Sequence, residues 1–160
     1  MAKIHLIYGR LCSGKTTLAK ELAALEKAVV LSCDELMLAI FPEDGLGNSY
    51  EEISTRAKEY LWKKAFEMNA AGVNVILDWG FWTKSAREDA LSRCRERNIP
   101  FVRHLIDIPD EEWHRRIEKR NQAVRLGLRQ DYLVDEGLYK KFFSRYEAPS
   151  RDEVDAVHHE

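Results

Sequence analysis

The sequence predicts an α/β fold built on a doubly wound, mainly parallel sheet. Short apolar runs alternate along the chain with longer segments of helical periodicity, the order that right-handed β-α-β crossovers require. The first apolar run leads directly into a glycine-containing loop. No internal repeat, low-complexity tract or linker interrupts the 160 residues, so we expect one domain over 1–160.

Each expected strand is a short apolar run, and each expected helix has a recognisable start or stop. The predicted strands are 3–8, 28–32, 73–77 and 101–106. The predicted helices are 16–25, 35–41, 50–71, 85–97, 110–120 and 134–146. Capping-box spacing at Ser49 and Ser85 marks the start of two of these helices. The chain end, 157–160, is expected to fray.

Composition excludes several classes of protein. The chain has 27 acidic and 25 basic residues, which argues against a nucleic-acid binder with a broad basic face. It contains no apolar run of the ~18 residues that a membrane-spanning helix needs and no signal peptide, so we expect a soluble cytoplasmic protein without a membrane partner. The 3 cysteines match no zinc spacing and are expected to be buried, reduced thiols.

The segment Gly9-Arg10-Leu11-Cys12-Ser13-Gly14-Lys15-Thr16 satisfies the pattern G-x-x-x-x-G-K-[ST], between a predicted strand and a predicted helix. In such a loop the backbone N–H groups turn inward and the helix N-terminus favours negative charge, so phosphates bind there. We therefore expect a fold of the P-loop NTPase type with a phosphate loop at 9–17. The expected ligands of ATP and Mg²⁺ in this loop are Gly9, Cys12, Ser13, Gly14, Lys15, Thr16 and Thr17.

Two aspartates follow predicted strands at the edge where ligands bind in doubly wound sheets. Asp34 is positioned to take a proton from an acceptor hydroxyl, or alternatively to cap the helix at 35–41. Asp78 is positioned to act on Mg²⁺ together with Thr16, or alternatively to contact the acceptor. Both positions suit a reaction that moves a phosphoryl group.

Arginines gather in the segment 110–130, which we predict to be a lid over the nucleotide. Arg116 and Arg120 are four residues apart on one helix face, and Arg125 and Arg129 follow. Such cations could neutralise the charge on a moving phosphoryl group, although Glu112 and Arg116 also have the spacing of an exposed ion pair. Which of Arg116, Arg125 and Arg129 completes the lid beside Arg120 stays open.

The acceptor is expected beside an aromatic cluster and a long helix. Trp79, Phe81 and Trp82 directly follow Asp78, and they suit either a pocket wall or core packing. The segment 43–72 is a possible acceptor-binding segment, with Arg56 facing the site.

These motifs together resemble the small P-loop kinases filed as AAA-type ATP-binding proteins, similar to chloramphenicol phosphotransferase, zeta-toxin kinases and polynucleotide kinase. The resemblance rests on GRLCSGKTT, SCDEL, VILDWGFWTKSAR, IPDEEWHRRIEKRN and YEAPSRDE in this order. It implies that Asp34 is the general base, that Lys15 and Thr16 hold phosphate and metal, and that Arg120 is a lid arginine. It also implies that 146–153 forms a turn near the adenine.

The sequence thus predicts a kinase that transfers the γ-phosphate of Mg-ATP to a hydroxyl of a small molecule. Lys15, Asp34, Arg116 and Arg120 are the expected catalytic residues, and Arg120 and Arg125 are expected to contact the nucleotide. Thr16 and Asp78 are the expected metal ligands. The alternatives are a kinase for 5'-hydroxyl nucleic-acid ends and a regulatory NTPase that transfers no phosphate. No obligate protein partner is expected.

Overall fold

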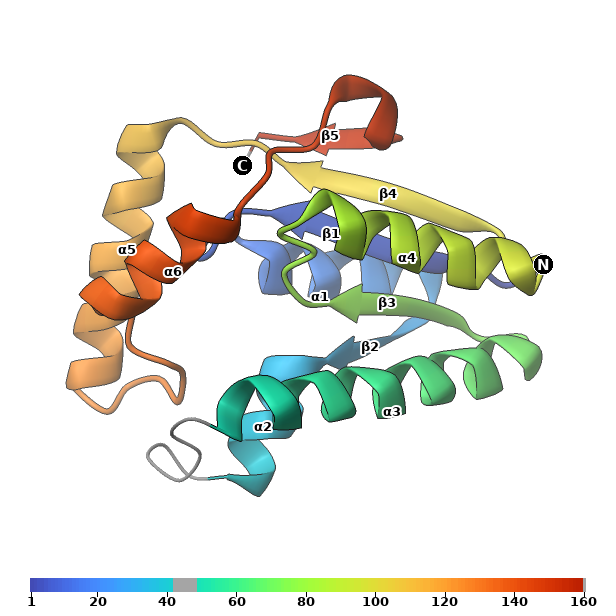
Figure 1. Cartoon of the computed structure of the whole chain (residues 1–160), viewed down its shortest axis with the longest axis horizontal. Coiled ribbons are helices and arrows are strands. Elements are labelled where there is room, and N and C mark those ends of the chain that lie inside the picture. The colour runs from blue at the N-terminus through green and yellow to red at the C-terminus, as the bar shows by residue number, and fades with distance from the viewer. Residues whose placement is uncertain (42–48, 160) are drawn as a thin grey trace.

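The computed structural model describes residues 1–41 and 49–159. A five-stranded, wholly parallel sheet has the strand order β2-β3-β1-β4-β5. In Figure 1, α3 and α4 lie on the near face of the sheet and α1 lies behind it, while α5 and α6 lie beyond the strand arrowheads. The predicted α/β class and parallel sheet are confirmed.

The element bounds lie within two residues of the predicted ones, except that α5 continues five residues beyond 120 and β5 was not predicted. The strands are β1 Ile4–Gly9, β2 Ala28–Ser32, β3 Asn74–Asp78, β4 Phe101–Ile106 and β5 Ala156–His158. The helices are α1 Lys15–Glu26, α2 Cys33–Ile40, α3 Tyr50–Ala70, α4 Lys84–Glu96, α5 Asp110–Arg125 and α6 Glu136–Arg145, followed by a 3-10 turn at Arg151–Glu153.

Apolar side chains cover both faces of the sheet, because alternate residues of a strand point to opposite faces. On one face Leu6 and Leu77 pack with Leu61 and Trp62 of α3. The opposite core, around Ile7, continues to lid and α6 residues; its buried members include Ala19, Leu22, Ile76, Ile106, Trp113 and Phe142. Because this core reaches α5 and α6, it fixes both helices beyond the carboxyl end of the sheet (Figure 1).

Several local features differ from those expected. The side chain of Thr83, not Ser85, caps α4 by accepting a hydrogen bond from the Ala86 N–H at 3.1 Å. Ser49 makes no side-chain capping bond to α3. At α2 the capping oxygen belongs to Ser32, which accepts from Glu35 N–H, so Asp34 is not the cap. Asp34 therefore keeps its carboxylate available for another role.

Residues 156–158 are not frayed. They pair with β4 as a fifth parallel strand, which makes the expectation of fraying wrong for 157 and 158, while 160 lies outside the described residues. The sequence does not predict this strand, because the strand is only 3 residues long and its pairing partners are distant in the sequence. Within the described ranges, no helix is long and apolar enough to cross a bilayer. The polar start of the possible acceptor segment, 43–48, lies outside the described residues.

Candidate active site

The phosphate loop joins β1 to α1, and its geometry depends on two glycines. Gly14 has a left-handed φ of 107° and precedes the first residue of α1. A Cβ at Gly14 would lie 2.9 Å from Arg116 Nη1, and one at Gly9 would lie 2.6 Å from Ser13 Oγ. A larger side chain at either position would crowd the inside of the loop. Glycine therefore keeps open the concavity that phosphates need.

Lys15 and Thr16 start α1 and point in different directions. The Lys15 ammonium donates hydrogen bonds to the carbonyls of Gly9 and Arg10, at 3.2 and 2.6 Å. Burial lowers the pKa of Lys15, while the nearby carboxylates Asp78 and Asp34 act in the opposite direction. The Thr16 hydroxyl donates to Asp78 Oδ2 at 2.8 Å. Lys15 is thus hydrogen-bonded to the loop and lies within electrostatic reach of the carboxylates of Asp34 and Asp78.

Thr16 and Asp78 provide the oxygen ligands that suit Mg²⁺. Asp78 is 6% exposed at the end of β3, and burial raises the pKa of its carboxyl. Among the described residues, no cluster of three or more His, Cys, Asp or Glu has the geometry of a metal site. Mg²⁺ needs no such cluster, because it commonly takes one or two protein oxygens and completes its shell with water and phosphate oxygens. The pair fits this ion.

Asp34 lies in the first turn of α2 and lines the pocket described below. Its pKa is raised, first by partial exclusion of water in the surrounding cleft and then by the negative charge of Asp131. Lys15 and Arg120 oppose this shift. The carboxylate therefore lies within electrostatic reach of both the phosphate-loop lysine and the lid arginine.

Two of the predicted lid arginines contact the phosphate loop. Arg116 Nη1 donates to the Ser13 carbonyl at 2.7 Å. Arg120 Nη1 lies 3.1 Å from Cys12 Sγ, and its Nη2 lies 2.6 Å from Asp131 Oδ1. Arg125 is exposed at the end of α5, and among the described residues it makes no hydrogen bond or ion pair with the loop, so this geometry favours Arg116 beside Arg120.

The other predicted loop residues differ in their surroundings. Ser13 is fully buried, and its hydroxyl has no protein hydrogen-bond partner among the described residues. Cys12 is half-buried and, like Cys33 and Cys94, is a free thiol. Thr17 is exposed on α1. An unpartnered hydroxyl inside the loop is consistent with a polar ligand there.

The lid helix is anchored to the phosphate loop at its own N-terminal end. The indole Nε1–H of Trp113 donates to the Leu11 carbonyl at 2.6 Å, and Trp113 is 1% exposed. The guanidinium of Arg10 lies over the Trp113 ring, 4.4 Å from its centroid, and donates to Asp110 Oδ1 at 2.6 Å. These contacts fix the base of α5 while the arginines project from its next turns.

The segment after the lid is folded back onto α5. Asn121 donates from Nδ2 to the Val134 carbonyl and accepts from the Val134 N–H, both at 2.8 Å. The Asp131 carboxylate forms ion pairs with Arg120 and Arg129. The ring of Tyr132 packs edge-on against that of Tyr50, with centroids 5.9 Å apart. The lid therefore connects directly to the start of α3.

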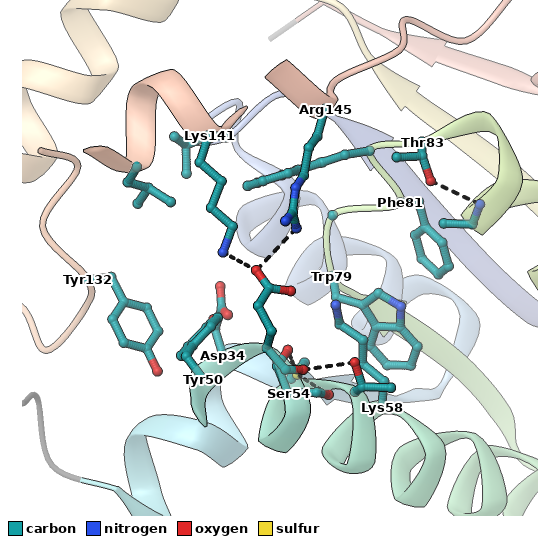
Figure 2. A pocket seen from close by; sticks show the side chains of 18 of the residues that line it. Asp34, Tyr50, Ser54, Lys58, Trp79, Phe81, Thr83, Tyr132, Lys141 and Arg145 are labelled. Atoms are coloured by element: carbon teal, nitrogen blue, oxygen red, sulfur yellow. Dashed lines mark hydrogen bonds and ion pairs between the residues drawn. The ribbon is translucent and has the colours of Figure 1, made fainter. Parts of the chain in front are cut away.

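A pocket of about 1330 Å³ lies beside the phosphate loop, and we call it the central pocket. Its walls come from α3, from the loop after β3, from α6 and from the segment around Tyr132, as Figure 2 shows. Asp34, Arg120 and Leu11 are among its lining residues. A molecule in this pocket would therefore meet the carboxylate, the lid arginine and the phosphate loop.

The aromatic cluster serves both as core and as pocket wall. Trp79 and Phe81 stack with centroids 5.5 Å apart, and both are almost fully buried. They nevertheless line the central pocket together with Trp62 and Trp82. The two roles proposed from sequence are thus compatible.

The sequence did not predict most of the residues that α3, α6 and the segment around Tyr132 contribute to the central pocket, and we call this part the outer pocket. Asp131, Tyr132, Lys58, Lys141 and Arg145 line it, whereas Arg56 is exposed and is not among its lining residues. The signal for Lys58 was available, since Glu51, Ser54 and Lys58 share one face of a predicted helix. No local sequence pattern could have predicted that α6 lies against α3.

A family model described as an AAA domain matches residues 4–149. The chain belongs to this family. Among curated protein sequences, none matches this one. Kti12 of Chaetomium thermophilum in complex with ADP-AlF3 is similar in structure, with a TM-score of 0.70 and 19% identity over 98% of this chain and 88% of that chain.

Two further solved structures resemble this AAA-domain protein. The APS kinase CysC of Mycobacterium tuberculosis, in complex with AMPPNP and APS, gives a TM-score of 0.68 at 22% identity, over 99% of this chain and 88% of that chain. A chain of the Pnkp1/Rnl/Hen1 RNA repair complex gives 0.71 at 21% identity, over 90% of this chain and 43% of that chain. These similarities show the fold, and the resemblance to small P-loop kinases is confirmed.

Proposed function

We propose that the protein is a Mg-ATP-dependent phosphotransferase that acts on a hydroxyl of a small molecule bound in the central pocket. The observation that carries this proposal is that Asp34 and Arg120 line the same pocket, and that Arg120 also contacts Cys12 of the phosphate loop. A carboxylate on the acceptor side and an arginine on the phosphate side are the groups that phosphoryl transfer uses. Relatives solved with AMPPNP and with ADP-AlF3 support nucleotide binding at the loop.

In this mechanism each residue has a separate task. Lys15 leaves the Gly9 and Arg10 carbonyls to bind the β- and γ-phosphates. Thr16 and Asp78 would hold Mg²⁺, which would supply positive charge beside the phosphates. Asp34 orients the acceptor hydroxyl and takes its proton as the oxygen bonds to the γ-phosphorus and the bond to the β-phosphate oxygen breaks. Arg116 and Arg120 stabilise the negative charge on the group in transit.

Transfer of labelled γ-phosphate from ATP into a small-molecule extract tests this function. We expect a labelled product with the wild-type protein and none with Lys15→Ala. Asp34→Asn should lower transfer by at least 100-fold while the dissociation constant for ATP stays within about threefold, because Asp34 acts on the acceptor. Glu35→Gln, an exposed neighbour in the same turn, is the matched control and should keep transfer. Undiminished transfer by Asp34→Asn would remove Asp34 as the base.

Two other functions are alternatives to a small-molecule kinase, because proteins of the same fold suit them. The RNA repair relative suits an end kinase, and Kti12 suits a regulatory NTPase. An arm with a 5'-hydroxyl oligonucleotide and an arm with no acceptor separate them from a small-molecule kinase. Label on the oligonucleotide would indicate the first, and release of inorganic phosphate with no labelled product from any acceptor would indicate the second.

A further inference from the structure

Two basic residues of α6 converge on a single oxygen atom at the outer end of the central pocket. Arg145 Nη1 lies 3.1 Å from Glu51 Oε1, and the Lys141 ammonium binds the same oxygen. Figure 2 shows the Lys141 and Arg145 side chains reaching from α6 into the pocket, each with a dashed line to the same oxygen. All three residues line the pocket. The geometry for binding one anion with two cations is therefore already formed.

The charges at this place do not balance. Two cations face one carboxylate, and the pKa of Glu51 is held below its usual range, first by the hydrogen bond from Lys141. The other pocket arginines are paired with at least one carboxylate each: Arg93 with both Glu59 and Asp89, and Arg120 with Asp131. Lys58 also lines the pocket, on α3. Lys141 and Arg145 therefore form a local pair of cations that share a single carboxylate.

The contact with Glu51 is also easy to exchange. Its side chain is 55% exposed, and those of Lys141 and Arg145 are 34% and 50% exposed. Ion pairs in such exposed positions contribute little to stability. A ligand anion that is held in the pocket by further contacts can therefore displace Glu51 into water at small cost.

We propose that Lys141 and Arg145 form an acceptor subsite for a carboxylate or phosphate group, and that Glu51 fills this subsite until the acceptor binds. The acceptor is then a hydroxylated small molecule that carries an anionic group, with its hydroxyl towards Asp34 and its body against the wall formed by Trp79 and Phe81. This inference rests on the proposed phosphotransferase function. It adds which class of acceptor that site takes.

The transfer test uses an extract divided on an anion exchanger. We expect label to enter products from the retained, anionic fraction and not from the neutral flow-through. Treating the retained fraction with alkaline phosphatase, which is then removed, distinguishes the two anions: loss of acceptor activity indicates a phosphate ester, and persistence indicates a carboxylate. Label only from the flow-through would overturn the subsite and leave the kinase proposal standing.

Variants test the residues. The double variant Lys141→Gln/Arg145→Gln should raise the KM for the anionic acceptor by about 10- to 100-fold, because it removes two charged hydrogen bonds, and should leave ATP affinity unchanged. Lys140→Gln is the matched control, since Lys140 is 73% exposed, pairs with Glu136 and does not line the pocket. An unchanged KM for the double variant would overturn the subsite.

A binding test stands apart from transfer. With the nucleotide site saturated by AMPPNP and Mg²⁺ and ionic strength held constant, inorganic phosphate and citrate are titrated while the fluorescence of the pocket tryptophans is followed. Glu51→Gln should tighten binding of at least one probe by about three- to tenfold, and the double variant should abolish it. If Glu51 only ties α3 to α6, then Glu51→Gln would lower the melting temperature without tightening anion binding, and the subsite would be rejected.

The two failures can be told apart. If no fraction yields a labelled product, the proposed phosphotransfer is wrong, and the binding test alone then decides whether the anion subsite exists. If label appears but Glu51→Gln and the double variant bind both probes as the wild type does, the kinase stands and the subsite falls.

Discussion

The guanidinium of Arg120 is held by the carboxylate of Asp131, with Nη2 and Oδ1 2.6 Å apart and side chains only 12% and 13% exposed. Arg120 also donates to the Tyr132 carbonyl at 3.0 Å. The lid arginine is therefore oriented by a segment that itself lines the central pocket. We infer that Asp131 is a positioning residue for Arg120.

Replacing Asp131 by Asn should lower turnover by about tenfold or more, because Arg120 loses its charged partner and no longer points at the transferred group. The affinity for ATP should change much less, since Lys15 and the loop backbone provide most of the phosphate contacts. Acceptor-free ATP hydrolysis and ATP titration measure the two effects separately. Arg129→Gln is the control, because Arg129 shares Asp131 but is 50% exposed. Equal turnover of Asp131→Asn and wild type would rule out the positioning role.

The pair formed by Thr16 and Asp78 predicts a change in metal dependence. Asp78→Asn keeps an oxygen that can accept from the Thr16 hydroxyl but removes the negative charge near Mg²⁺. We expect the Mg²⁺ concentration for half-maximal activity to rise by about tenfold or more, while the melting temperature stays within a few degrees of the wild type. A magnesium titration of ATP hydrolysis measures this. Normal magnesium dependence in Asp78→Asn would exclude Asp78 from the metal site.

The positions of the phosphate loop, of the two aspartates and of the arginine-bearing helix α5 could be predicted because each is marked by a short local pattern. Lys15 and Thr16 belong to a motif, and Asp34 and Asp78 follow apolar runs whose ends meet at one edge of a parallel sheet. These patterns depend only on neighbouring residues and on the rules of α/β topology. The fold class followed from the same rules.

The outer pocket could not be predicted in this way. Contact between Glu51 and Lys141 joins residues 90 positions apart, and it depends on where α6 packs after the lid. α6 is placed by Phe142, which is fully buried and packs on Trp82 with centroids 5.1 Å apart. Amphipathic spacing predicts that such a helix exists, but not which face of the sheet or which helix it meets.

Asp34 predicts a pH dependence. A general base must be deprotonated, and the pKa of Asp34 is raised, first by exclusion of water and then by Asp131. The acid limb of the transfer rate should therefore lie above the ordinary aspartate value of about 3.9. The rate is measured against pH with saturating Mg-ATP, and circular dichroism at each pH checks that the protein stays folded. An acid limb at or below the ordinary value, in folded protein, would contradict a base of this kind.

The ion pair between Arg87 and Glu153 predicts how stability changes in acid. Arg87 is 2% exposed; its Nε lies 2.9 Å from Glu153 Oε1, and its Nη1 donates to the Glu147 carbonyl at 2.8 Å. The pair thus ties α4 to the segment that resembles an adenine turn. The hydrogen bond from Arg87 lowers the pKa of Glu153 to about 2.

Because the pKa of Glu153 is lower in the folded state, its contribution is fully present above the ordinary glutamate pKa of about 4.3 and is lost as the pH falls towards 2. Glu153→Gln should therefore lower the free energy of unfolding by about 1–3 kcal/mol at pH 7, and the difference from wild type should shrink below about pH 4. Urea unfolding of both proteins from pH 7 to pH 3 measures this difference. Glu96→Gln, in which the altered side chain is 71% exposed, is the control and should change stability by less than about 0.5 kcal/mol. A Glu153→Gln deficit that stays constant over this pH range would show that Glu153 stabilises the fold by packing alone and not through its charge.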